Sequence, residues 1–187
     1  SFNVYLMVSG GSADIDYIEA GQKNTPPEIV SFAYTQPVYS VEADGVNTDY
    51  LLAGTEYEVS LQTFDFDNDN VTVRVLLDQT YSGTEGKVKF TISNPGEVAG
   101  RLIADDGHTW TVAKRNLVVC GSLEDMIGKV GAYDQAQTYS KQSMKQYENA
   151  LAAAKGLMSG GYTESMKAAL EKLKAAADAL VLLIPSA

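Results

Sequence analysis

The chain has 187 residues, of which 45% are hydrophobic and 20% are charged, and its formal net charge is −10. This balance is typical of a globular protein and argues against intrinsic disorder. The acidic character disfavours DNA or RNA as a partner, because phosphate recognition requires a basic surface. No run of about 18 apolar residues occurs, so the sequence predicts no membrane span.

The composition changes near Gly121. Residues 1–121 contain 17 acidic and seven basic side chains, whereas residues 122–187 contain seven of each. The first part is rich in Val, Thr, Tyr and Phe, which suit strands, and the second in Ala, Leu, Lys and Gln, which favour helices. The sequence therefore predicts two modules, an all-β module followed by an all-α module.

Residues 1–22 are predicted to form a terminal strand pair. In the segment 2–8, the alternate residues Phe2, Val4, Leu6 and Val8 fall on one face of a strand, and 14–20 follows it after a Gly-rich turn. The pair is either the end of a preceding β module or an extra hairpin of the next one. Because the start shows neither an initiator Met nor a signal-peptide pattern, we expect the chain to be a piece of a larger protein.

Residues 23–121 are predicted to form one antiparallel β-sandwich of immunoglobulin-like type. Runs of strand-forming residues recur at about ten-residue spacing, separated by turns rich in Gly, Asp and Asn. The expected strands are 28–35, 38–43, 55–64, 70–78, 86–93, 97–104 and 109–119. The chain has one Cys, so no disulfide within it can join the sheets, and burial of apolar side chains must hold them together. The expected core includes Val59, Leu61, Val73, Val75, Phe90, Ile92, Leu102 and Trp110.

Residues 122–187 are predicted to form an all-α three-helix bundle with short loops. Ser122 and Ser140 are predicted N-caps, and Thr163 is predicted to start the third helix. Apolar residues follow each of the three at the three-to-four spacing of a helix face.

The helical part resembles the FIVAR module of secreted surface enzymes and adhesins of Gram-positive bacteria. The positions that carry the likeness are Tyr139, Ser140, Ser143, Ala150, Leu151, Ala154, Leu173 and Leu180. The chain departs from that pattern at Met144, where the family often has Trp, and at Gly161-Tyr162-Thr163, where it usually has Asn-Ala-Thr.

The N-terminal segment VYLMVSGGSADIDYIEA is similar to the closing strands of carbohydrate-binding modules of the family 6 and family 35 kind. This resemblance implies that Asp16 helps to hold a structural calcium ion. Asp14 stands where the family often has an Asn that reaches the sugar, which is a departure from the pattern.

The order of these modules resembles the C-terminal region of large secreted glycoside hydrolases. The resemblance implies a secreted or cell-surface location and neighbouring modules of the same parent protein as partners.

A second candidate for calcium is the loop that contains Asp65, Asp67 and Asp69. Alternating acids can place three carboxylates on one side of a loop, and calcium prefers such oxygen ligands. The loop lacks the Gly and the distal Glu of an EF-hand. The alternative is a turn in which Asp and Asn bind backbone amides without a metal.

No catalytic residue is predicted. Asp105 and Asp106 are interpreted as a β-turn, the single His, His108, as an exposed turn residue, and Cys120 as a buried core residue. Tyr34, Tyr39, Tyr50, Tyr57, Tyr81 and Trp110 are candidates for stacking on sugar rings, although strand Tyr residues are often buried.

The sequence therefore predicts a non-catalytic spacer or interaction region of a secreted carbohydrate-active enzyme. Two alternatives remain open at this point. One is a module that binds host or plant glycans through aromatic residues of the sandwich. The other is part of an adhesin that binds a host protein.

Overall fold

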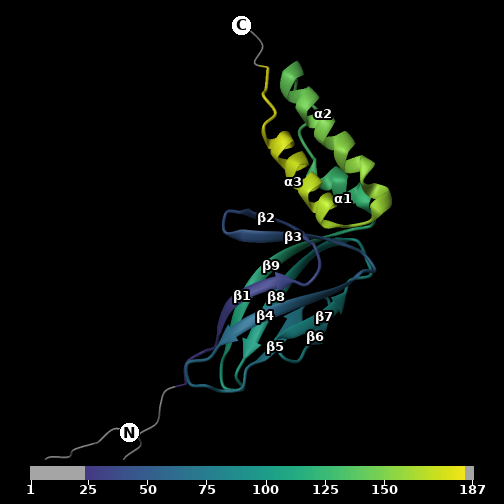
Figure 1. The fold of residues 1–187 in the computed structure, drawn as a ribbon. Helices are drawn as coiled ribbons and strands as arrows, with labels where there is room; N and C mark the ends of the chain where they lie inside the picture. The colour runs from purple at the N-terminus through teal and green to yellow at the C-terminus, as the bar shows by residue number, and fades with distance from the viewer. Residues whose placement is uncertain (1–23, 184–187) are drawn as a thin grey trace, which may run out of the picture.

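A computed structural model describes residues 24–183 (Figure 1). The predicted strand pair in residues 1–22 and the proposed calcium ligand Asp16 lie outside the described residues. In the described part, a β-sandwich is followed by three helices. No described helix is long and apolar enough to cross a membrane.

Within residues 24–183, nine strands form two sheets. A three-stranded sheet has the order β1-β4-β7, and a six-stranded sheet has the order β2-β3-β9-β8-β5-β6. The three-stranded sheet matches strands A, B and E of immunoglobulin-like sandwiches, and β6-β5-β8-β9 matches their strands C′, C, F and G. The β2–β3 hairpin is an addition to this pattern and lies beside β9. The strands are β1 Glu28–Tyr34, β2 Tyr39–Ala43, β3 Val46–Leu52, β4 Glu56–Phe64, β5 Thr72–Leu76, β6 Thr80–Ser82, β7 Lys87–Thr91, β8 Gly96–Asp105 and β9 Trp110–Cys120.

The sandwich core lies between the two sheets. The three-stranded sheet contributes Tyr57, Val59, Leu61, Val88 and Phe90, and the six-stranded sheet contributes Leu51, Val73, Val75, Leu102, Leu117 and Val119. The predicted core is confirmed except at one position. Trp110 is 66% exposed, because it begins β9 opposite Asp105 at the open end of the sheet.

The prediction that every strand pair is antiparallel is wrong for one pair. β3 and β9 run parallel, with Thr48 opposite Asn116 and Leu52 opposite Cys120. After β1 the chain crosses from the three-stranded sheet to the six-stranded one and forms a hairpin, whose second strand lies beside β9. Two strands, β3 and β6, are absent from the predicted set.

The β2–β3 hairpin turns at Asp44 and Gly45. Both residues have positive φ, 51° and 74°, and the strands close on the pair Ala43 and Val46. Two left-handed residues in a two-residue loop make a type I′ turn, whose twist matches that of the strands it joins. The hairpin therefore projects as a regular two-stranded element from the edge of the sheet (Figure 1).

The C-terminal part contains α1 (Leu123–Val130), α2 (Lys141–Gly156), a short 3-10 turn (Met158–Gly160) and α3 (Glu164–Asp178). The predicted caps Ser122 and Ser140 are confirmed, since they accept hydrogen bonds from the amides of Asp125 and Ser143. Thr163, predicted to start the third helix, is the N-cap of α3 and accepts from the Met166 amide. One loop differs from the prediction. Residues 131–140 form a long connection between α1 and α2, and Tyr139 in it pairs with Leu182.

A second core joins the helices to the sheet. Tyr39 from β2 and Cys120 from β9 are buried in one cluster with Met126, Ile127, Met166, Leu170 and Leu173 from the helices. The chain passes from β9 to α1 through Gly121 and Ser122, and the Gly121 amide donates to Asp125. The helices therefore pack directly on the β2-β3-β9 side of the sandwich.

Candidate ligand-binding groove

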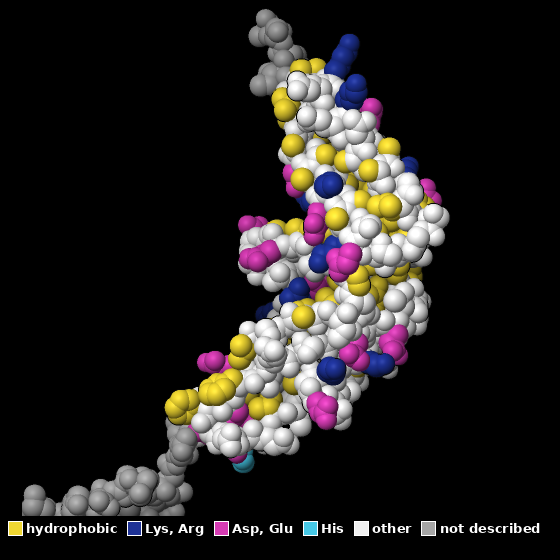
Figure 2. All heavy atoms as spheres, in the orientation of Figure 1, with side chains coloured by type: hydrophobic (Ala, Val, Ile, Leu, Met, Phe, Trp, Pro, Cys, Tyr) yellow, Lys and Arg dark blue, Asp and Glu magenta, His cyan; other side chains and the backbone are white. Residues whose placement is uncertain are grey.

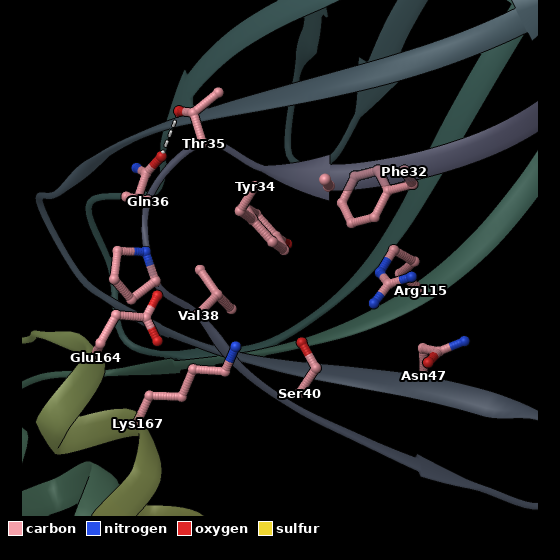
Figure 3. A pocket seen from close by; sticks show the side chains of 12 residues that line it. Phe32, Tyr34, Thr35, Gln36, Val38, Ser40, Asn47, Arg115, Glu164 and Lys167 are labelled. Atoms are coloured by element: carbon pink, nitrogen blue, oxygen red, sulfur yellow. Dashed lines mark hydrogen bonds between the residues drawn. The ribbon is translucent and has the colours of Figure 1, made fainter.

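A groove with a volume of about 480 Å³ lies between the sandwich and the start of α3. Its walls come from β1, the crossing segment after it, the β2–β3 hairpin, β9 and α3 (Figure 3). In Figure 2 the hairpin projects from the molecule, and Lys and Arg side chains gather at the hollow beneath it. The volume lies in the range of small-molecule sites.

The crossing segment after β1 is held by Gln36. Its side-chain amide donates to the Glu56 carbonyl at 2.8 Å and accepts from the Glu58 amide at 3.2 Å. The Thr35 amide adds a bond of 2.9 Å to the Glu58 carbonyl. Three bonds to one stretch of β4 thus shape this wall.

The floor of the groove contains an ion pair between Asp49 of β3 and Arg115 of β9. Arg115 donates from Nε to Oδ2 at 2.6 Å and from Nη2 to Oδ1 at 2.7 Å, which is a two-pronged contact. Tyr34 and Ser40 donate their hydroxyls to the same carboxylate at 2.9 and 2.6 Å. The Asp49 side chain has no exposed area, so these four bonds replace its water shell.

The Arg115 guanidinium also lies over the ring of Phe32, 4.4 Å from its centre, in a cation–π contact. Burial by itself would lower the pKa of Arg115, but the hydrogen bonds and the charge of Asp49 raise it. Burial, followed by the charge of Asp49, raises the pKa of Tyr34. At neutral pH Arg115 therefore stays charged and the Tyr34 hydroxyl keeps the proton that it donates to Asp49.

The opposite wall carries two charged side chains from the first turns of α3, Glu164 and Lys167. The Thr163 cap places them, since its carbonyl accepts from the Lys167 amide at 2.9 Å. Neither side chain forms an ion pair with any residue in the range 24–183. The groove therefore presents a fixed guanidinium on its floor and a movable ammonium and carboxylate on its wall.

The predicted calcium loop has a different geometry. Asp65 Oδ1 accepts from the amides of Asp67 and Asp69 at 2.9 and 3.0 Å, and Asp67 Oδ2 accepts from the Thr25 amide. Asn68 lies at φ 65°, as Asn does in tight turns. Within the described part of the chain, no group of three or more His, Cys, Asp or Glu side chains is placed to hold a metal ion. Calcium binding at Asp65, Asp67 and Asp69 stays a prediction.

The other predicted residues do not meet in one site. Asp106 forms the expected turn, because its Oδ1 accepts from the amides of His108 and Thr109 at 2.7 and 2.6 Å. Cys120 is fully buried, as predicted, and burial raises the pKa of its thiol to about 11. It therefore stays protonated at neutral pH and is a poor nucleophile.

The aromatic candidates divide by exposure. Tyr39 and Tyr57 are buried core residues, whereas Trp110 is exposed, together with Phe64 and Phe66, which the sequence prediction did not include. Tyr34 faces the groove, but its hydroxyl is committed to Asp49.

The sequence prediction missed the charged residues that line the groove, Arg115, Glu164 and Lys167, and the buried Asp49 that holds Arg115. One signal was available for Asp49. It occupies an inward position of a strand whose next inward residue is Leu51, and an acid at such a position needs a partner. Its partner lies 66 residues away in the sequence, which no local pattern reveals.

No family model matches the sequence, and no curated protein matches it either. A solved structure of a quinonprotein alcohol dehydrogenase-like protein from Bacteroides thetaiotaomicron aligns with a TM-score of 0.33 and 16% identity over 50% of this chain. This chain covers only 20% of that protein.

Two further structures give similar scores. The PKD domain of an M14-like peptidase from Thermoplasmatales archaeon SCGC AB-540-F20 aligns with a TM-score of 0.34 and 22% identity, over 51% of this chain and 99% of that one. The CBM51-2 and INT domains of Clostridium perfringens ZmpB align with a TM-score of 0.30 and 13% identity, over 89% of this chain and 46% of that one. Scores this low establish neither a shared fold nor a shared function.

Proposed function

We propose that this chain is a non-catalytic spacer region of a larger secreted or cell-surface protein, and that it holds the modules before and after it at a fixed distance. The observation that carries the proposal is the second core, which joins the sandwich and the helices into one packed unit. The described part begins at one end of the molecule and finishes at the other (Figure 1). A spacer requires both a single packed unit and chain ends on opposite sides of it.

The packing at the junction argues for rigidity. Domains in one chain move relative to each other unless their interface is large and hydrophobic. Here Met126, Met166 and Leu170 are fully buried and pack with Tyr39 and Cys120 of the sheet. Bending at the junction would expose these side chains to water, at a cost of roughly 1.5–3 kcal/mol for each one.

A distance measurement between spin labels tests this role. Labels would be placed at His108→Cys, at the exposed end of the sandwich, and at Lys141→Cys, at the start of α2, with Cys120 replaced by Ser. We expect one narrow distance distribution. A broad or multiple distribution would contradict the proposal, and the added change Met126→Ala should broaden it.

We further propose that the parent protein is a carbohydrate-active enzyme, a glycoside hydrolase, and that the helical part is its FIVAR module. The resemblances of residues 1–20 and 139–180 support this parentage. The gene tests it directly. A glycoside hydrolase domain is expected in the same reading frame, and a reading frame without any enzyme domain would favour the adhesin alternative.

A further inference from the structure

We propose that the groove between the sandwich and α3 binds a monocarboxylate saccharide, such as a hexuronic acid, with Arg115 and Lys167 as the groups that recognise its carboxylate. This binding role is separate from the spacer role and does not depend on it. Five observations support it: the free edge of Arg115, the position of Lys167, the charge balance of the lining, its polar groups and the size of the groove.

Arg115 has a second donor edge. Asp49 occupies Nε and one proton of Nη2, whereas Nη1 forms no hydrogen bond with any described residue. A planar guanidinium can bind one carboxylate along its Nε–Nη2 edge and another along its Nη1–Nη2 edge. Since Asp49 and Phe32 hold the guanidinium in place, a ligand would not have to order it.

Lys167 supplies the second cation. Figure 3 shows its ammonium group directed across the groove toward Ser40, with Arg115 beyond it and Asn47 nearby. In residues 24–183 no acidic side chain forms an ion pair with Lys167. A carboxylate in the groove can therefore accept from a rigid donor on the floor and a flexible one on the wall.

The charge balance limits the kind of anion. Asp49 compensates Arg115, and Glu164 lies on the same wall as Lys167, so the lining has no excess positive charge. A phosphate with two negative charges would find no compensating excess, whereas one carboxylate needs only directed donors. The groove therefore fits a singly charged group better than a phosphate.

The remaining lining fits hydroxyl groups. Asn47 makes no side-chain hydrogen bond with the described residues, the Ser40 hydroxyl can still accept, and Glu164 accepts at the wall. A sugar acid presents one carboxylate and several hydroxyls, which match this set. A volume of about 480 Å³ has room for such a ligand.

The test is a titration of the isotope-labelled full chain, residues 1–187, with sodium glucuronate, followed by heteronuclear NMR. We expect saturable shifts of the amide signals of Ser40, Asn47, Arg115 and Lys167. Glucose and sodium acetate at matched ionic strength form two parallel arms, and each should bind at least about fivefold more weakly, because each lacks one half of the recognised chemistry.

The variant Lys167→Met should weaken glucuronate binding about tenfold, the loss typical of one charge-assisted hydrogen bond. Lys172→Met is the matched control, since Lys172 is exposed on the same helix outside the groove, and it should bind as the unchanged chain does. Asn47→Ala provides a second test and should also weaken glucuronate binding. Asn47 makes no side-chain hydrogen bond with the described residues, so the change removes no contact within the fold.

Three results would overturn the proposal. The first is the absence of saturable shifts at the groove amides. The second is equal binding of glucose, which would show that the carboxylate is not recognised. The third is equal binding of acetate, which would show that the groove binds carboxylates without regard to the sugar. None of these results bears on the spin-label distances, so the spacer proposal is judged separately.

Discussion

At the scale of single residues, the fold should be most sensitive to the loss of one partner of the Asp49–Arg115 ion pair. The Asp49 carboxylate is fully buried and the Arg115 guanidinium is largely buried, so the two charges compensate each other where little water reaches them. Replacing both with apolar residues of similar volume is often tolerated, whereas removing one leaves a buried charge without a partner.

We therefore expect Asp49→Asn to lower the free energy of unfolding by about 3 kcal/mol. The double change Asp49→Leu with Arg115→Met should recover part of that loss. Urea denaturation measures both, with Glu42→Gln on the exposed surface of the same hairpin as the control. A loss for Asp49→Asn no larger than that of the control would show that the pair does not stabilise the fold.

Asp106 should make stability depend on pH. The hydrogen bond from the Thr109 amide, followed by that from Asn24, lowers the pKa of Asp106 below the ordinary value of 3.8. A carboxyl whose pKa is lower in the folded state stabilises the fold above its unfolded pKa and loses this effect as the pH falls through the folded value.

The change Asp106→Asn should therefore destabilise the protein at neutral pH. The difference from the unchanged chain should shrink as the pH falls below the ordinary carboxyl value of 3.8. Thermal unfolding across a pH series measures this, and a difference that stays constant with pH would contradict the assignment.

At the scale of elements, the helix starts depend on short polar contacts. Ser140 accepts from the Ser143 amide at 3.2 Å, and the Ser143 hydroxyl in turn accepts from the Val181 amide at 3.1 Å. The cap of α2 is thus linked to the segment that follows α3.

Ser140→Ala should cost about 1 kcal/mol, the usual value for the loss of an N-cap. Ser165→Ala is the control, because Ser165 is exposed in the first turn of α3 and is not its N-cap. If chemical denaturation gives both variants equal stability, the cap does not contribute.

The Asp65 loop has a testable role with or without calcium. Because Asp65 binds two backbone amides, Asp65→Ala should cost about 1 kcal/mol even with a chelator present. Calorimetric titration then decides the metal question. If millimolar calcium produces neither heat nor a thermal shift, the prediction of a calcium site at Asp65, Asp67 and Asp69 is wrong.

At the scale of the whole molecule, the shared second core should make the sandwich and the helices unfold together. Cys120 reports on this junction, since it is the only Cys of the chain and is fully buried between the sheet and α1. Its thiol becomes accessible to a labelling reagent only when the junction opens.

We expect Cys120 labelling and far-UV circular dichroism to give the same midpoint in a urea series. Labelling in the absence of urea should be slow. Fast labelling of the folded protein, or a labelling midpoint well below that of the helices, would show that the junction opens independently and would argue against a rigid spacer.

The sequence predicts those features that depend on residues close together in the chain. The caps at Ser122 and Ser140 each involve an amide three residues ahead. Seven of the nine strands also follow from local patterns. β6 has three residues, which is too short for a periodic pattern, and β3 contains polar residues and the acid Asp49.

Taken by itself, the sequence determined the division into strands and helices, the helix caps and most of the sandwich core, because these depend on local periodicity and on contacts within one turn. Only the tertiary structure decided that β3 pairs with β9 in parallel, that Asp49 meets Arg115, and that one core joins the sheet to the helices. Each of these depends on the register between segments far apart in the chain, which is set by the packing of the whole molecule. The groove has the same origin, since its floor comes from β3 and β9 and its wall from α3.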